Sequence, residues 1–143
     1  MIIRKMEERD LYDVAALYEI LSGEKSNIES MVNQFALANS NKNYMLVVAE
    51  EQGKVAGTAM GIVCLNMMAD FNSFLVIEAV IVGEEFRRKG IGKGILQYLE
   101  REAKSRGCSY LVLVSGEQRK EAHRLYEYLG YGKDGVKGFR KLL

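Results

Sequence analysis

The residues best suited to chemistry lie between Gly83 and Gly94, where the chain reads Gly-Glu-Glu-Phe-Arg-Arg-Lys-Gly-Ile-Gly-Lys-Gly. The preceding residues, Phe74 to Val82, are apolar except for Glu78 and predict a buried strand, and an amphipathic helical pattern follows the loop. Backbone N–H groups at a helix start lack partners and attract anions, and glycine lets a phosphate approach the backbone closely. The stretch therefore predicts a diphosphate-binding loop.

Two common phosphate-binding motifs do not fit this loop. A nucleoside triphosphatase loop needs Gly-x-x-x-x-Gly-Lys-Ser/Thr, but Gly94 follows Gly92-Lys93 and Arg87 stands in place of the first glycine. A dinucleotide fingerprint needs a third glycine where Ile95 stands. The diphosphate must therefore belong to another class of ligand.

The remaining pattern, Arg-x-x-Gly-x-Gly over residues 87–92, resembles the pyrophosphate loop of the GNAT superfamily of acetyl-CoA-dependent N-acetyltransferases. A second segment, Ala122-x-x-x-Tyr126-x-x-x-Gly130-Tyr131, resembles that family's Ala-x-x-x-Tyr-x-x-x-Gly-Phe/Tyr signature. The Ala-His-Arg-Leu-Tyr run and the ending Phe139-Arg140-Lys141-Leu142 are similar to a small-molecule branch that includes aminoalkylphosphonate N-acetyltransferases.

The resemblance implies how acetyl-CoA would be held. Backbone N–H groups from Arg88 through Lys93 would bind the pyrophosphate, the end of the preceding strand would pair with the pantetheine arm, and basic side chains would add charge-assisted contacts. A solvated loop is the alternative interpretation of the basic cluster. The implied cofactor-binding residues are Val80, Ile81, Val82, Arg87, Arg88, Lys89, Gly90, Ile91, Gly92 and Lys93.

The same resemblance implies that the hydroxyl of Tyr126 lies near the sulfur and protonates the departing thiolate. A phenol with an ordinary pKa of about 10 stays protonated at neutral pH and can donate to a thiolate with a pKa of about 8.5. A core tyrosine is the alternative, because Tyr126 shares an apolar helix face with Ala122 and Leu129.

Glu78 is the candidate for the base that takes a proton from the acceptor amine. Strict alternation along the strand predicts that it shares a face with Val80 and Val82, where burial would raise its pKa toward the range useful for a base. Several family members resemble this Ile-Glu-x-Val/Leu-x-Val pattern and use such a glutamate, often through water. A structural glutamate or an anchor for the amine stays open.

Five further residues need an interpretation. Arg119 stands where many family members carry an asparagine that helps to hold the cofactor, and Glu84 stands where a proline is common. His123, the only histidine, is expected either at the rim of the site or on the surface. Cys64 and Cys108 have no metal-ligand spacing, so both are expected in the core and no metal site is predicted.

The predicted elements form an α/β (α+β) fold, with a single mixed, mostly antiparallel sheet of about six to seven strands flanked by about four helices. This is the order of the GNAT fold, and residues 1–143 are expected to be one such domain. Strands are predicted at Ile2–Met6, Tyr44–Glu50, Val55–Asn66, Phe74–Val82, Tyr110–Val114 and about Lys137–Leu142; helices follow an Asp10 N-cap, a Ser26-x-x-Glu29 capping box, the glycine loop and Arg119.

Composition limits the partners. With a net charge of +1 over 143 residues, the chain has no overall attraction for nucleic acid or anionic lipid. No apolar run approaches the roughly 20 residues that cross a bilayer, and the first residues lack a signal-peptide core, so a cytoplasmic protein is expected. The sequence leaves a homodimer open.

The expected function is direct transfer of an acetyl group from acetyl-CoA to a primary amine of a small molecule, in a ternary complex. The acceptor pocket is expected at Ser22–Ser30, the Asn66–Ser73 turn and the last strand, where Glu24 and Asp70 could attract a cationic amine. The alternatives are a non-catalytic acetyl-CoA-binding or regulatory module and a protein N-acetyltransferase. Release of free thiol from acetyl-CoA with a panel of amines would separate an enzyme from a binding module.

Overall fold

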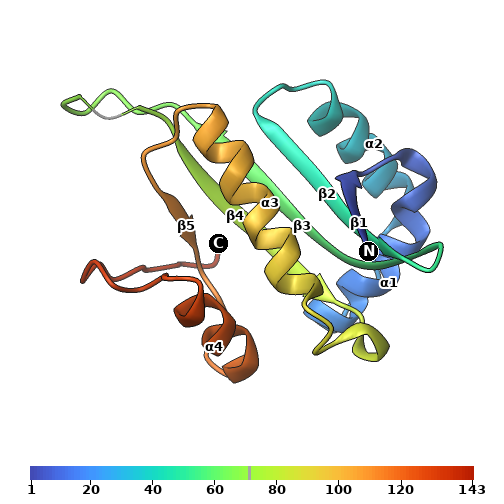
Figure 1. Cartoon of the computed structure of the whole chain (residues 1–143). Helices are drawn as coiled ribbons and strands as arrows, with labels where there is room; N and C mark the ends of the chain where they lie inside the picture. Colours follow the sequence, from blue (N-terminus) through green and yellow to red (C-terminus); the bar gives the residue numbers. More distant parts are fainter. Residues whose placement is uncertain (71) are drawn as a thin grey trace.

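The structure is a computed structural model that describes residues 1–70 and 72–143. One sheet of five strands, in the order β1-β2-β3-β4-β5, runs through the molecule (Figure 1). The first four strands pair antiparallel, and β5 pairs parallel with β4. The strands are β1 Ile2–Lys5, β2 Tyr44–Glu51, β3 Lys54–Cys64, β4 Phe74–Val82 and β5 Leu111–Leu113.

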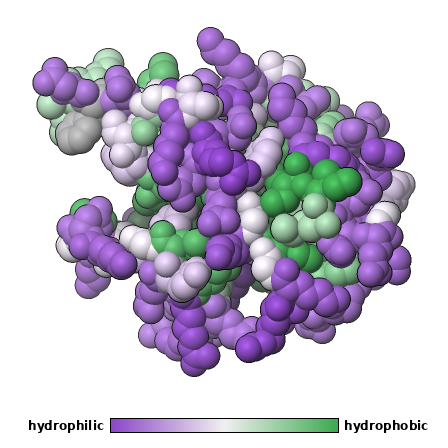
Figure 2. All heavy atoms as spheres, viewed as in Figure 1, coloured by the Kyte–Doolittle hydropathy of each residue, from purple (hydrophilic) through white to green (hydrophobic). Residues whose placement is uncertain are grey.

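Helices cover both faces of this mixed, mostly antiparallel sheet. In Figure 1, α3 crosses the near face, α1 and α2 lie on the other face, and α4 follows β5 at the sheet edge. Hydrophilic residues cover much of the surface over α3, as expected of an amphipathic helix (Figure 2). The helices are α1 Leu11–Ser22, α2 Ile28–Asn39, α3 Ile91–Ser105 and α4 Lys120–Tyr128, with short 3₁₀ helices η1 Glu8–Asp10 and η2 Glu84–Phe86. None of the helices in the described chain is long and apolar enough to cross a membrane.

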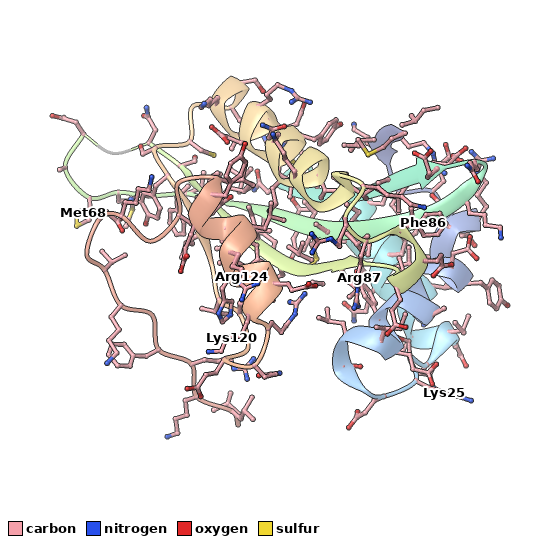
Figure 3. The ribbon with its side chains drawn as sticks, turned by 60° about the horizontal axis from the view of Figure 1, so that its bottom comes forward. Lys25, Met68, Phe86, Arg87, Lys120 and Arg124 are labelled. Atoms are coloured by element: carbon pink, nitrogen blue, oxygen red, sulfur yellow. The ribbon has the colours of Figure 1, made fainter. Side chains whose placement is uncertain are left out.

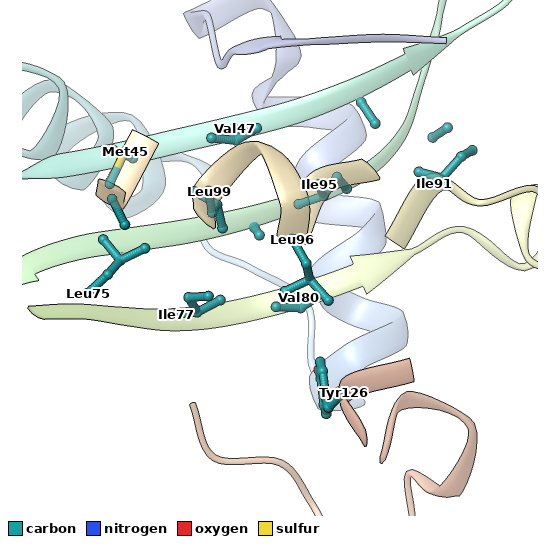
Figure 4. Close-up of a cluster of buried hydrophobic side chains, with 14 of the residues drawn as sticks. Met45, Val47, Leu75, Ile77, Val80, Ile91, Ile95, Leu96, Leu99 and Tyr126 are labelled. Carbon is teal, nitrogen blue, oxygen red and sulfur yellow. The ribbon is translucent and has the colours of Figure 1, made fainter. Parts of the chain in front are cut away.

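Two apolar clusters hold the layers together. The larger one, drawn in Figure 4, packs α3 against the sheet and includes Ile77, Ile95 and Leu99, which are at most 1% exposed. The smaller one packs α1 against β2 through residues such as Val14 and Val48. Burial of each such side chain contributes about 1.5–3 kcal/mol, so the sheet is a rigid support for whatever lies at its edges.

The sheet has fewer strands than the six to seven predicted. The predicted last strand, Lys137–Leu142, does not form, and the described chain after α4 has no regular element. The chain that leads to it turns at Gly130, Gly132 and Gly135, which adopt positive φ, and residues 137–142 pair with no strand of the described sheet. The apolar side chain of Phe139 is 85% exposed. The expected number of four α-helices is confirmed.

Asp10 is the N-cap residue of α1, as predicted, whereas the predicted start of the second helix is wrong. Asp10 precedes α1 but makes no capping bond there; its carboxylate accepts hydrogen bonds from both terminal nitrogens of Arg4, at 2.7 and 2.9 Å, and from the Glu7 N–H. The Arg4 guanidinium lowers the pKa of this carboxyl. The second helix is capped by Asn27, which accepts from the Ser30 N–H, and not by the predicted capping box.

The hairpin between β2 and β3 is confirmed. Gln52 and Gly53 both have positive φ, 53° and 76°, the signature of the tight turn that matches the twist of paired strands. The turn expected at 66–73 connects β3 and β4, but Phe71 within it lies outside the described residues.

Candidate active site

A cavity of about 720 Å³ opens where β4 ends, α3 begins and α4 passes. Its size is within the range of small-molecule sites. Figure 3 shows Arg87 beside this space from the loop side, and Lys120 and Arg124 from α4. The lining residues are Ile20, Leu21, Val80, Ile81, Val82, Phe86, Arg87, Arg88, Gly90, Ile91, Gly92, Lys93, Gln118, Arg119, Lys120, Glu121, Ala122, Arg124, Leu125 and Tyr126.

The edge of β4 is open toward this cavity. The short strand β5 pairs with β4 only over Leu75–Ile77, so in the described chain the β4 residues after Ile77 have no β5 partner. The backbone of Val80 to Val82 is thus available to an extended ligand with amide groups, as an exposed sheet edge is to an added strand. These are the residues predicted to contact the pantetheine arm, and the structure places all of them in the lining.

A β-bulge interrupts β4 at this edge. Ala79 has φ +53°, and the register with β3 shifts between Thr58, opposite Ile81, and Met60, opposite Glu78. A bulge adds a residue to one strand and re-aims the side chains that follow it. The alternation along β4 therefore changes phase just before the cavity.

The bulge makes the predicted setting of Glu78 wrong. Ile77 and Val80 both belong to the core under α3, so Glu78 points to the opposite face of the sheet, and its side chain is exposed rather than buried. Glu78 is not among the residues that line the cavity. Glu78 lies on the same face of the sheet as Ile81, a residue that lines the cavity. The carboxylate of Glu78 is therefore on the side of the sheet covered by α1.

The glycine loop has a backbone conformation suited to an anion. Arg88 and Gly90 have φ of +62° and +78°, and Gly90 is the residue from which α3 begins. The first N–H bond of α3 runs from Gly94 to the Gly90 carbonyl at 2.9 Å, so the N–H groups of the three residues before Gly94 lie in the unpaired first turn. Those residues all line the cavity. The loop thus presents a helix N-terminus to the ligand space.

The two glycines of the motif serve different purposes. A Cβ on Gly90 would meet no atom within 4 Å, so glycine is needed there for its left-handed conformation. A Cβ on Gly92 would lie 3.1 Å from the Leu125 Cδ2 and 3.6 Å from the Val82 Cγ2, so glycine there allows α3 to approach α4 and β4 closely. Gly92 therefore sets the width of the cavity between those elements.

Positive charge surrounds the cavity. The predicted residues Arg87, Arg88 and Lys93 line it, whereas Lys89 does not and instead lies with its Nζ 5.4 Å from the Phe86 ring centre. The sequence interpretation missed Lys120 and Arg124, which line the opposite side from consecutive turns of α4. Their four-residue spacing was the available signal. Among the described lining residues, Glu121 is the single carboxylate.

Tyr126 joins the core and the cavity. It is 7% exposed, its ring contacts Tyr131 edge-to-face at 5.9 Å, and it also lines the cavity (Figure 4). Burial raises the pKa of its hydroxyl, while the charge and hydrogen bonding of Arg119 act in the opposite direction. Tyr126 therefore packs in the core and also lines the cavity, so the two interpretations of this residue do not exclude each other.

His123 supports a loop instead of lining the cavity. Its Nε2 lies 2.9 Å from the Gly116 carbonyl and 3.2 Å from the Ser115 hydroxyl. These contacts connect α4 to the loop after β5, which carries Arg119. His123 is thus not among the residues that line the cavity, and its ring contacts Ser115 and Gly116 of this loop.

Most of the chain matches one family model. Residues 14–131 match the model of the Acetyltransferase (GNAT) family. The chain belongs to the GNAT family of acetyltransferases. The match includes β4, the glycine loop and the Tyr126 segment, which are the parts that surround the cavity. The name of the matched model describes the members of this family as acetyltransferases.

Individual relatives extend this finding. The [Ribosomal protein bS18]-alanine N-acetyltransferase of Escherichia coli (strain K12) is 27% identical over 100 residues, which are 70% of this chain and 63% of that protein. A glucosamine-6-phosphate N-acetyltransferase structure from Arabidopsis thaliana is 26% identical, with a TM-score of 0.84 and coverage of 98% and 97% of the two chains. A putative acetyltransferase from Agrobacterium tumefaciens str. C58 has a TM-score of 0.91 at 23% identity over 100% of both chains, which shows the fold.

Proposed function

We propose that this GNAT protein transfers the acetyl group of acetyl-CoA to a primary amine of a small molecule by direct transfer in a ternary complex. The observation that carries the proposal is one cavity with a cationic helix N-terminus at one side and the Tyr126 side chain at the other. The diphosphate and the thioester lie at opposite ends of the pantetheine arm of acetyl-CoA, and these are the two groups that need such surroundings. Residues 1–143 as one domain, the cytoplasmic location and a homodimer stay predictions.

The residues present fit the cofactor. The N–H groups at the start of α3 and the side chains of Arg87 and Arg88 would hold the diphosphate, because a helix N-terminus and guanidinium groups both favour phosphate oxygens. The open β4 edge from Val80 to Val82 would pair with the amides of the pantetheine arm. Together they would direct the thioester from the glycine loop toward Tyr126.

Tyr126 supplies the proton for the leaving thiolate. Because burial raises its pKa from the ordinary value near 10, the hydroxyl is protonated throughout the neutral range. As the amine nitrogen bonds to the carbonyl carbon and the C–S bond breaks, the phenol gives its proton to the sulfur. The position of Tyr126 in the cavity lining and the burial of its side chain support this role as a proton donor.

Glu78 accepts the amine proton through water. Its exposed carboxylate on the α1 side of β4 is reached by solvent, and Glu78 directly precedes the bulge at Ala79. From the same position, the Glu78 carboxylate could instead bind a cationic amine and hold it in place. Glu78→Gln separates the two: loss of the acidic limb of the rate–pH profile supports the base, and a raised KM for the amine with an unchanged profile supports the anchor.

A protein amine is the second candidate acceptor. It is favoured by the 27% identity to an enzyme whose name gives ribosomal protein bS18 alanine as its target. Both acceptors present a primary amine, so the same catalytic groups serve either. The size of the acceptor decides between them.

The test is release of free thiol from acetyl-CoA. The purified protein is incubated with a panel of small primary amines, including aminoalkylphosphonates and amino sugars, and with a peptide that begins with alanine. We expect thiol release with a small amine, and release with the peptide alone would replace the first acceptor by the second. Binding of acetyl-CoA in a calorimeter without thiol release from any acceptor would indicate the non-catalytic module and overturn the proposal.

A further inference from the structure

Two cations of α4 face the cavity from the side opposite the glycine loop. Lys120 and Arg124 are four residues apart, which places them on one face of the helix, and both line the cavity (Figure 3). Arg87 lines the cavity from the loop side. The cavity therefore has two separate groups of positive charge, and we call Lys120 and Arg124 the α4 cation pair.

The α4 cation pair has no acidic partner in the part of the chain that the structure describes. Neither Lys120 nor Arg124 takes part in any of the ion pairs found there. Glu121, the acidic residue of the described lining, lies instead near Arg88 of the glycine loop, with 3.9 Å between its Oε1 and the Arg88 Nη1. The positive charge of the pair is thus left facing the cavity.

These charges do not help the helix that carries them. Like charges four residues apart on a helix repel each other. Lys120 is also the first residue of α4, where the positive end of the helix dipole disfavours a cation. An anion bound in the cavity would relieve both penalties, so the pair is better explained by a ligand than by the stability of α4.

The diphosphate of acetyl-CoA is accounted for without the α4 cation pair. The unpaired N–H groups at the start of α3 and the Arg87 side chain lie on the loop side of the cavity. Acetyl-CoA also carries a phosphate monoester, the 3′-phosphate, which has a charge of about −1.5 to −2 at neutral pH. An acceptor that bears a phosphate or phosphonate would present the same chemistry. A lysine and an arginine side by side match such a dianion in charge.

We propose that Lys120 and Arg124 form a second phosphate subsite in this cavity, which binds a terminal phosphate dianion apart from the diphosphate at the glycine loop. The inference rests on the proposed binding of acetyl-CoA in the cavity. The dianion belongs either to the 3′-phosphate of the cofactor or to a phosphate or phosphonate on the acceptor. Arg124 supplies a planar fork for two oxygens, and Lys120 supplies a compact charge.

The first arm of the test concerns the cofactor. Binding of acetyl-CoA and of acetyl-dephospho-CoA, which lacks only the 3′-phosphate, is measured by calorimetry for the wild type, Lys120→Gln, Arg124→Gln and the double variant. Low salt is used because it leaves exposed charges unscreened. If the dianion is the 3′-phosphate, the wild type should prefer acetyl-CoA about 30-fold, each single variant less, and the double variant less than about threefold.

A matched control removes one lysine and one arginine elsewhere. Lys54→Gln combined with Arg101→Gln changes two exposed residues that do not line the cavity, and it should keep the wild-type preference. An equal loss of preference in this control would show an effect of net charge and overturn the subsite. Because the α4 charges oppose the helix, Lys120→Gln and Arg124→Gln should not lower the melting temperature of the ligand-free protein. A lower value would contradict the inference by giving the charges a structural role.

The second arm concerns the acceptor. Thiol release gives the KM of an aminoalkylphosphonate and of the alkylamine with the same chain length, in the wild type, the double variant of the α4 cation pair and the matched control. If the dianion belongs to the acceptor, the double variant should raise the KM of the phosphonate about tenfold relative to that of the alkylamine. The preference for acetyl-CoA over acetyl-dephospho-CoA should then stay unchanged.

Failure of the subsite can be told from failure of the proposed function. If the wild type does not bind acetyl-CoA, the proposed function fails. The subsite alone is overturned if the wild type binds acetyl-CoA but neither arm shows an effect. In that result the double variant has the wild-type preference between the two cofactors, and the phosphonate either keeps its relative KM or is not acetylated.

Discussion

The two sides of the cavity bind by different means. The glycine-loop side, from Arg87 to Lys93, presents backbone N–H groups whose directions depend on the local conformation of Arg88 and Gly90. The α4 side presents side chains, with Tyr126 and Arg119 aimed inward by packing against Tyr131 and β4. A backbone site tolerates changes of side chain but not of conformation, whereas a side-chain site has the reverse sensitivity.

The largest expected effect is on the α4 side. Tyr126→Phe removes the proton donor while retaining the ring that packs in the core, so kcat should fall about 100-fold with little change in acetyl-CoA affinity. Thiol-release kinetics and calorimetry measure the two quantities. A variant that loses affinity and keeps kcat would show that the α4 side holds the cofactor as the loop side does.

The same residue predicts the alkaline pH dependence. Because the pKa of Tyr126 is raised, its acid form persists as pH rises, so the rate should stay level between about pH 7 and 9 and fall only above the ordinary phenol pKa near 10. A fall below pH 9 in kcat, measured with an amine that is already deprotonated there, would assign the acid role to another group.

The next effect is on the loop side, at its contact with α4. Gly92→Val should raise the dissociation constant of acetyl-CoA about 30-fold, since overpacking costs about 2 kcal/mol and would push Leu125 and α4 outward. Gly92→Ala is the graded control, because the Leu125 side chain can shift by the few tenths of an ångström required. Equal affinity in both variants and the wild type would show that the cavity width does not matter.

The smallest of these effects tests backbone conformation alone. Gly90→Ala should weaken acetyl-CoA binding about tenfold, because a left-handed residue with a Cβ costs roughly 1–2 kcal/mol. Gly90→Asn should weaken it less, because asparagine adopts this conformation more readily and the site of its Cβ is empty. If asparagine is as harmful as alanine, the glycine is needed for space at the ligand and not for its φ.

The sequence predicted the loop side more completely than the α4 side. Every predicted loop residue except Lys89 lines the cavity, because neighbours along the chain were read together with the strand and helix that bracket them. Lys120 and Arg124 were missed, although they are close along the helix, since nothing local indicates which face of α4 meets the cavity. Tyr126 was found through the family signature.

The β4 strand shows why the remaining details needed the fold. Strict alternation along Phe74–Val82 predicted Glu78 on the same face of the sheet as Val80. The residue inserted at Ala79 moves the side chains after it to the opposite faces, so Val80 and Glu78 lie on different faces. A bulge is defined by the register with the neighbouring strand, so a single strand's sequence does not reveal it. The predicted strand at Lys137–Leu142 fails for a similar reason, because strand formation requires a partner that its apolar pattern does not supply.

The sequence alone determined the family and predicted the diphosphate-binding loop and the place of Tyr126 at the site, because these depend on short spacings and on the glycine that a left-handed turn requires. Only the tertiary structure decided which face Glu78 occupies, why Gly92 must lack a side chain, and that Arg119 donates to the Val80 carbonyl. Those features join segments that are distant along the chain, such as Arg119 and Val80, which are 39 residues apart. Distances between such segments are set by packing of whole elements, which no local pattern encodes.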